Sequence, residues 1–273
     1  MLLSQNKILN HLRQGTIVIE PFNKKQLKTT SYDVTLGEWF WREGHPAGRA
    51  TIHNIYDASS TSNVWQGPFR AEPAGVISKR LAAEFKNIPN KARVILLAPG
   101  ETILAHTQEF IGGRDICVAK MYARSSLGRN FIEVCKDAGW GDVGYFNRWT
   151  MEVTNNSKHY TIPLVVSRRI AQMVFYEVAP LTVHPVRSLA RPVRESRQDK
   201  KNVIDGKSRA FTLSNGTSPK DLGEATSNGV KTLDYVGEGG KYQLSQNINE
   251  LKKTWRPEMM LPKMHLDWEV KKR

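Results

Sequence analysis

The sequence predicts a mostly-β protein with few short helices, folded as a jelly roll or β-sandwich. Short runs rich in β-branched and aromatic residues follow one another from residue 16 to residue 178. Gly, Pro, Asn or Ser separate most of these runs, as they commonly separate strands. Helical periodicity, by contrast, nearly disappears after Gly15. Many short strands with few helices are typical of two packed sheets.

One short helix is expected before the strands. Ser4 can cap its start, Ile8 and Leu12 follow at helical spacing, and Gly15 can end it. Pro99-Gly100 lies between two apolar runs and predicts a hairpin turn. The strands are expected within seven runs, at residues 16–22, 31–41, 92–107, 116–123, 148–155, 161–167 and 171–178.

The composition indicates a globular protein with no membrane contact. The 273 residues are 40% hydrophobic and 24% charged, which is enough for a full core. No run reaches the roughly 18 apolar residues that a membrane helix needs, and the N-terminus lacks the apolar stretch of a secretion signal. Cys117 and Cys135 are too few for a disulfide framework and are expected as buried thiols. The expected location is cytoplasmic.

A change of composition near Pro180 predicts three parts. Residues 1–181 should form the β core and carry the active-site residues. Residues 182–233 are basic and rich in Ser, Thr and Gly, and should form a flexible insertion because they can bury little apolar surface. Residues 234–273 should hold a lid and a C-terminal tail, whose Trp, Met and Leu side chains can dock on the core.

The last third of the chain is the most basic part. The formal net charge is +14, and residues 182–273 contain 18 Lys and Arg against 11 Asp and Glu. Such a balance favours a polyanionic partner and leaves open a weak nucleic-acid contact through this tail. A solvated basic surface accounts for the same charge equally well.

Residues 121–155 contain most of the candidate catalytic and substrate-binding residues. Arg124, Ser125 and Ser126 follow an apolar strand and can begin a helix, where their side chains and free amides would suit a phosphate. Further along, residues 141–145 resemble a tight turn that leads into the next strand.

Alternation along that strand puts Thr150, Glu152 and Thr154 on one face and Trp149, Met151 and Val153 on the other. A carboxylate in a pocket would have a raised pKa and could act as a general base. A surface glutamate is the other interpretation, and alternation alone favours it.

Several of these residues together resemble the active-site segment of the dCTP deaminases, a branch of the dUTPase-like superfamily. The run Arg124-Ser125-Ser126-Leu127 is followed in matching order by Arg129, Asp142 and Glu152. Glu152 stands 27 positions after Ser125, and this spacing aligns without a gap. Upstream, residues 31–37 and 97–101, with Ala105 and Thr107, resemble the family's early strand and hairpin. Downstream, residues 240–243 with Tyr235 resemble its C-terminal lid.

The resemblance implies a dUTPase-like distorted jelly roll assembled as a homotrimer with active sites shared between subunits. In that family Glu152 would be the general base that activates water, Ser125 would orient the water, and Arg129 would hold the glutamate and the substrate. Mg²⁺ would arrive with the triphosphate, with no metal held by protein side chains and no zinc. The implied substrate-binding residues are Arg124, Ser126, Ala138, Asp142, Tyr145, Thr150, Tyr235, Lys241, Gln243 and Gln246.

The expected reaction is zinc-independent deamination of a deoxycytidine nucleotide, most simply dCTP to dUTP and ammonia, by a hydrolase acting on a cyclic amidine C–N bond. Zinc deaminases use a Pro-Cys-x-x-Cys element, and two isolated cysteines offer no such spacing. Alternatives are a dUTP pyrophosphatase, a bifunctional enzyme that makes dUMP, and a non-catalytic nucleic-acid or regulator binding protein. Asp137, Trp140, Gly141 and Ser245 depart from the family's usual pattern.

Overall fold

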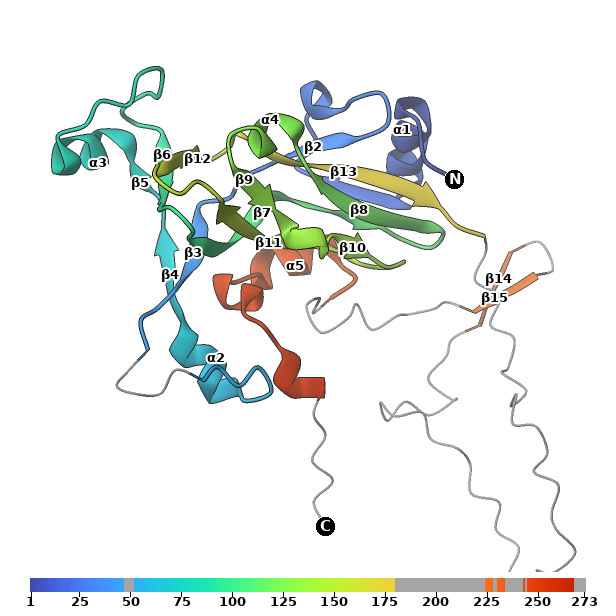
Figure 1. The fold of residues 1–273 in the computed structure, drawn as a ribbon. Helices are drawn as coiled ribbons and strands as arrows, with labels where there is room; N and C mark the ends of the chain where they lie inside the picture. Colours follow the sequence, from blue (N-terminus) through green and yellow to red (C-terminus); the bar gives the residue numbers. More distant parts are fainter. Residues whose placement is uncertain (47–51, 180–223, 228–229, 234–242, 244, 268–273) are drawn as a thin grey trace, which may run out of the picture. The chain divides into compact units, whose positions relative to one another are not determined.

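The computed structural model describes residues 1–46, 52–179, 224–227, 230–233, 243 and 245–267. It confirms a mostly-β fold with few short helices (Figure 1). The chain divides into two compact units, residues 1–179 with 237–273, and residues 180–236. In the second unit, β14 (Glu224–Ser227) pairs antiparallel with β15 (Val230–Leu233). The expected insertion and the basic tail lie largely outside the described residues and stay predictions.

The first unit contains three antiparallel sheets. The main sheet has the order β4-β3-β7-β11-β9, with β1 also on β7. Its strands are β1 (Ile17–Glu20), β3 (Trp39–Glu43), β4 (Trp65–Arg70), β7 (Thr102–Gly113), β9 (Ile132–Val134) and β11 (Phe146–Asn155). The second sheet has the order β10-β8-β13-β2, with bounds Trp140–Gly141, Cys117–Ala123, Arg169–Glu177 and Tyr32–Thr35. The third has the order β12-β6-β5, with bounds Ile162–Val165, Arg93–Leu97 and Glu72–Pro73.

Every expected strand run forms at least one strand, but the hairpin expected at Pro99-Gly100, within the 92–107 run, is wrong. Pro99-Gly100 does turn the chain, with Gly100 at a φ of 74°. The turn joins β6 to β7, yet β6 pairs with β5 and β12 while β7 pairs with β1, β3 and β11. The chain therefore passes from one sheet to another there and forms no hairpin, because the two flanking strands have other partners.

The helices are short. They are α1 (Gln5–Gln14), α2 (Ala58–Val64), α3 (Ala74–Leu81), α4 (Ser125–Gly128) and α5 (Ile248–Thr254), with 3₁₀ turns η1 (Lys24–Gln26), η2 (Cys135–Asp137), η4 (Pro257–Met260) and η5 (Met264–Asp267). The expected N-terminal helix is α1, and Gly15 ends it at a φ of 80°. Ser4 stands at its N-cap, but the serine side chain makes no capping hydrogen bond, contrary to expectation. In the described part of the chain no helix is long and apolar enough to cross a membrane.

The core lies between the main and second sheets. Trp149, Met151 and Val153 of β11 pack there with side chains from β8 and β13, and each is at most 4% exposed. Cys117 and Cys135 are buried free thiols, as expected. The alternation predicted for β11 is therefore confirmed, and it fixes which of its side chains face away from this core.

A second apolar cluster lies on the opposite face of the main sheet, where the C-terminal segment packs. Leu251 and Trp255 are 0% and 6% exposed there, against Leu104 and Phe110 of β7. The indole nitrogen of Trp41 also donates to the carbonyl of Pro257 at 2.9 Å. Figure 1 shows α5, in red, beside β11. The docking expected for the final stretch is thus confirmed for residues 248–261, while residues 268–273 lie outside the described residues.

Gly37 is a position where the fold has no room for a side chain. A Cβ there would lie 2.0 Å from Cε1 of His106, whose ring is itself buried. We expect Gly37→Ala to lower the free energy of unfolding by about 1–3 kcal/mol, because overpacking must displace this ring. Urea unfolding measures the loss. Gly128→Ala is the matched control, since a Cβ there meets nothing within 4 Å; an equal loss in both variants would contradict the prediction.

Candidate functional site

Glu152 lies on the outward face of β11, away from the core between the sheets. It stands opposite Leu104 of β7, two residues from Thr150, which stands opposite His106. Both Glu152 and Thr150 are half-buried. Burial raises the pKa of the Glu152 carboxyl, while a hydrogen bond from its own backbone and the charge of Lys136 lower it. The structure therefore does not favour the interpretation of Glu152 as a plain surface glutamate.

The loop η2 passes beside Glu152. Cys135, Lys136 and Asp137 all have positive φ, at 69°, 38° and 66°, a conformation that non-glycine residues seldom adopt and that often marks functional sites. Lys136 donates to the hydroxyl of Thr102 at 3.2 Å, and Thr102 lies 2.8 Å from the hydroxyl of Thr154. Lys136 thus brings a cation to the face that carries Glu152, and its place in the sequence gave no signal for this.

The segment between β8 and β9 holds the serines and arginines of the expected phosphate site. Ser125, Ser126 and Arg129 are exposed at α4. Within the described part of one chain, the interactions of the Glu152 carboxyl involve neither Ser125 nor Arg129. The grouping of these three expected catalytic residues therefore stays a prediction.

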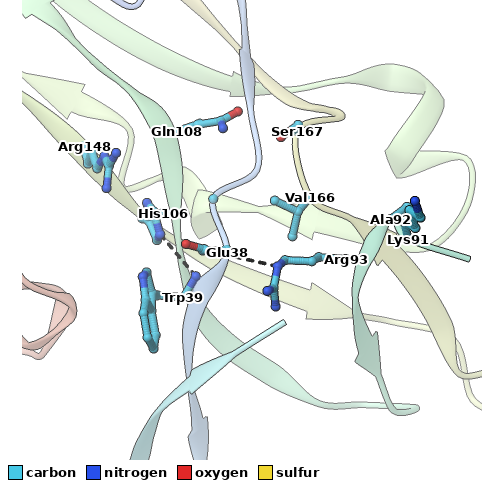
Figure 2. A pocket seen from close by; sticks show the side chains of 11 residues that line it. Glu38, Trp39, Lys91, Ala92, Arg93, His106, Gln108, Arg148, Val166 and Ser167 are labelled. Carbon is cyan, nitrogen blue, oxygen red and sulfur yellow. Dashed lines mark hydrogen bonds and ion pairs between the residues drawn. The ribbon is translucent and has the colours of Figure 1, made fainter. Parts of the chain in front are cut away.

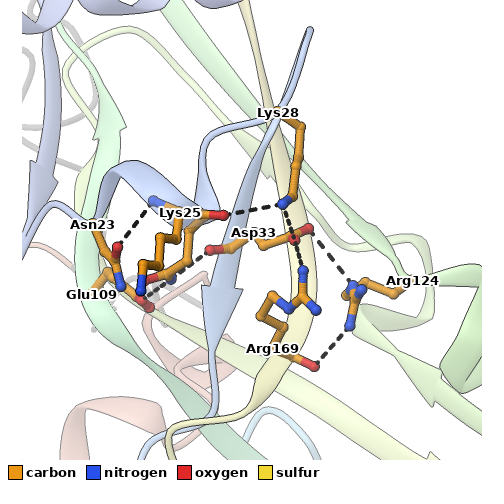
Figure 3. A network of polar contacts seen from close by, with 8 residues as sticks. Asn23, Lys25, Lys28, Asp33, Glu109, Arg124 and Arg169 are labelled. Atoms are coloured by element: carbon orange, nitrogen blue, oxygen red, sulfur yellow. Dashed lines mark hydrogen bonds and ion pairs between the residues drawn. The ribbon is translucent and has the colours of Figure 1, made fainter.

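Arg124 belongs to a polar network around a buried carboxylate. Asp33 of β2 is 3% exposed and lies 3.1 Å from Arg169, 3.7 Å from Arg124 and 3.9 Å from Lys28 (Figure 3). Arg124 also donates to the carbonyl of Arg169 at 3.4 Å. One carboxylate thus holds three cations, so the cluster keeps an excess of positive charge. Lys28 and Arg169 were not expected here, although Asp33 lies in the 31–37 run.

Asp142 and Tyr145 lie in the turn between β10 and β11. The indole nitrogen of Trp140 donates to Oδ1 of Asp142 at 2.8 Å, so this exposed tryptophan fixes the carboxylate. The ring of Tyr145 contacts that of Trp149 edge to face at 5.2 Å. Ala138 follows η2 and is exposed. The turn therefore presents Asp142 and one half-buried tyrosine side by side.

The residues of the expected lid that the structure describes contact this same turn. Gln243 is buried, accepts from the backbone nitrogen of Phe146 at 2.8 Å and donates to the carbonyl of Gly144 at 3.1 Å. Gln246 donates to the same carbonyl at 3.2 Å. Tyr235 and Lys241 lie outside the described residues. The lid sequence is thus connected to the turn that carries Asp142 and Tyr145.

Metal ligands do not gather in the part of the chain that the structure describes. No group of three or more His, Cys, Asp or Glu side chains is placed there to hold a metal ion. Whether Mg²⁺ arrives with a nucleotide and whether the reaction is zinc-independent remain predictions.

Comparisons with known proteins identify the family. A family model described as dCTP deaminase-like matches residues 2–178. The chain is 32% identical over 181 residues to a "dCTP deaminase, dUMP-forming" of Methanococcus aeolicus, covering 64% of this chain and 83% of that protein. A protein of the same name from Hydrogenobaculum is 32% identical over 179 residues, covering 64% and 81%. This chain therefore belongs to the dCTP deaminase-like family.

Among solved structures, the 2'-deoxycytidine 5'-triphosphate deaminase of Agrobacterium tumefaciens matches with a TM-score of 0.43 and 16% identity. The match covers 63% of this chain and 47% of that one. A second solved structure, "EIAV DUTPASE NATIVE", matches with a TM-score of 0.29 and 20% identity, covering 34% of this chain and 74% of that one.

The raised pKa of Glu152 predicts a pH-dependent effect on stability. A carboxyl whose pKa is higher in the folded state contributes stability below its unfolded pKa and loses it as pH rises through the folded pKa. We therefore expect Glu152→Gln to raise the free energy of unfolding at neutral pH, and we expect the gain to shrink in mild acid. Urea unfolding at fixed protein concentration measures both. Glu133→Gln changes an exposed carboxylate of β9 and should show no such pH-dependent gain.

Proposed function

We propose that this protein deaminates dCTP and releases dUMP. The observation that carries the proposal is the half-buried Glu152, whose pKa burial raises, at a spacing from Ser125 that aligns with the family. The family match supports deamination of dCTP. The names of the relatives specify dUMP, so the bifunctional alternative replaces the first expectation of dUTP as the final product.

In the first step Glu152 would take a proton from water, whose oxygen then bonds to C4 of cytosine. As the C4–O bond forms, the π electrons of C4=N3 would move to N3. Glu152 would pass its proton to the exocyclic nitrogen, the C4–N4 bond would break and ammonia would leave, and the remaining hydroxyl proton would move to N3 to give uracil. A general base works best when its pKa lies near the working pH, and the half-buried position of Glu152 raises its pKa in that direction. Thr150, on the same face of β11, would expose its backbone to the edge of the base, as would Ala138.

Ser125 and Arg129 would reach this base from a second subunit. Within the described part of one chain neither residue contributes to the raised pKa of the Glu152 carboxyl, which supports their arrival from a second copy. Subunits arranged around a symmetry axis repeat the same contact at each interface. A homotrimer with shared sites would therefore complete each site with one neighbour.

In the second step a water would attack the α-phosphorus of dUTP and break its bond to the bridging oxygen, which releases dUMP and diphosphate. Asp142, held by Trp140, would accept the proton of that water and contact the sugar, with Tyr145 beneath the ring. Ser126, Arg124 and Lys241 would bind phosphate oxygens, and Gln243 and Gln246 would support the lid. Mg²⁺ would arrive as part of the triphosphate substrate.

The two steps can be separated by two substitutions. We expect Glu152→Gln to slow dCTP deamination by about a hundredfold to ten-thousandfold, because it removes the general base. It should still convert added dUTP to dUMP. Asp142→Asn should accumulate dUTP from dCTP. Chromatography of reactions with dCTP, dUTP and Mg²⁺ measures all products.

Asp115→Asn is the control for the second substitution, since Asp115 is exposed and has a φ of 55° that asparagine tolerates. Full deamination by Glu152→Gln would show that the assigned base is wrong. Failure of the unchanged protein to produce either dUTP or dUMP would reject the proposed function.

Mixing two inactive variants tests the shared site. Arg129→Gln and Glu152→Gln should each be inactive alone, because each lacks one half of every site. Unfolded together and refolded as an equal mixture, they should recover roughly a quarter of the unmixed wild-type activity, the fraction of interfaces that combine two intact halves. A mixture of Glu152→Gln with Ser125→Ala should behave likewise. No recovery, with normal oligomers by sedimentation, would place all three residues in one subunit.

A further inference from the structure

A cleft opens between the main sheet and the small third sheet, and it shares no residue with the candidate site. Its volume is about 430 Å³, which lies in the range of small-molecule sites. Figure 2 shows the side chains that surround it, from the start of β3, the middle of β7, β11, the start of β6 and the loop before β13. Three basic side chains, Lys91, Arg93 and Arg148, line this cleft.

Positive charge in the cleft exceeds negative charge. Glu38 is the one carboxylate that lines it among the described residues, and it is already engaged. Arg70 binds Glu38 through two hydrogen bonds, at 2.9 and 3.3 Å, and Arg93 lies 3.6 Å away. Three cations therefore line the cleft with one carboxylate, and that carboxylate is already paired with Arg70 and Arg93. Such an excess attracts an anion that carries more than one charge.

Arg148 is held rigidly at the inner wall of the cleft with hydrogen-bonding capacity unused. Its guanidinium lies 5.0 Å from the ring of Phe110 and 4.7 Å from that of Trp255. Within the described part of the chain, its buried Nε has no hydrogen-bond partner. Burial lowers the pKa of Arg148, although Glu38 and Glu109 act in the opposite direction. A buried donor without a partner is costly; Nε itself is shielded from solvent, and other atoms of Arg148 line the cleft.

His106 forms a neutral part of the wall and does not compete for an anion. Nδ1 of its ring lies 2.8 Å from the carbonyl of Thr107, and Nε2 accepts from the backbone nitrogen of Trp39 at 3.3 Å. Burial lowers the pKa of His106 to about 3. The ring is therefore uncharged at neutral pH, and both of its nitrogens are engaged. Gln108 and Ser167 add neutral polar groups beside it.

We propose that this cleft is a second anion site that binds a phosphoryl group, with Arg148, Arg93 and Lys91 as its cations. The planar fork of an arginine binds phosphate oxygens through paired, charge-assisted hydrogen bonds. A diphosphate carries the several charges that the excess of cations favours and fits within the cleft. The phosphoryl group can belong to free diphosphate or to a nucleotide, and both present the same oxygens to the three cations.

Titration calorimetry of the full chain tests this site with two probes, inorganic diphosphate and dUMP. Arg148→Gln should weaken diphosphate binding by about tenfold, because a charge-assisted hydrogen bond is lost. Lys91→Gln should weaken it by roughly two- to fivefold, as expected for one exposed charge. The matched control is Lys79→Gln, which removes an exposed lysine of α3 outside the cleft and should change nothing. Equal losses for dUMP would show that the site also accepts a nucleotide.

Two further measurements distinguish this cleft from the candidate nucleotide site and from a contact between copies of the chain. Ser126→Ala changes the candidate nucleotide site and should leave the Arg148-dependent binding unchanged. Should Arg148→Gln fold poorly by circular dichroism, the exposed Lys91→Gln decides alone. Diphosphate binding that is absent in the wild type, or equal in the Lys91→Gln and Lys79→Gln variants, would overturn the proposal. So would dissociation of the oligomer by Lys91→Gln without any change in binding, since the cleft would then be a contact between copies.

Discussion

The antiparallel pairing of β11 with β7 is the constraint on which the rest of the structure depends. This pairing sends Trp149, Met151 and Val153 into the core between the sheets. It therefore turns the alternate residues of β11 outward, beside the alternate residues of β7. The register shifts between Arg148 and Thr150. The part of β11 before this shift and the part after it therefore face different neighbours. Core packing and the position of the candidate base are in this way set by the same ladder of hydrogen bonds.

Charged groups gather at three places in the fold. Glu152 is half-buried. The nearby cation Lys136 lies on η2, where the backbone has positive φ. Asp33 of β2 pairs with Lys28, Arg124 and Arg169. Glu38, directly before β3, pairs with Arg70 and Arg93. Each of the clusters around Asp33 and Glu38 contains more positive than negative charge, which favours anionic ligands.

Much of the fold was predictable because period-two alternation and turn residues are local signals. The seven strand runs and the inward residues of β11 followed from these alone. The partners of each strand did not, and Pro99-Gly100 was therefore mistaken for a hairpin. Within the candidate site, the resemblance in order and spacing singled out Ser125, Arg129 and Glu152 as candidates. Lys136 comes close to Glu152, and Asp33 and Arg169 come close to Arg124, only when the chain folds. No local pattern in the sequence marks such long-range neighbours.

The C-terminal segment covers an apolar part of the main sheet, and this affects how a shortened chain would behave. Leu251 and Trp255 cover apolar side chains of the main sheet that would otherwise face water. A chain that stopped soon after Gln243, through premature termination or proteolytic trimming, would leave Leu104 and Phe110 uncovered. Exposed apolar patches of this kind promote association between molecules. Chains that have lost the tail would therefore be less soluble. Chains that keep the tail would make up most of the protein that stays in solution.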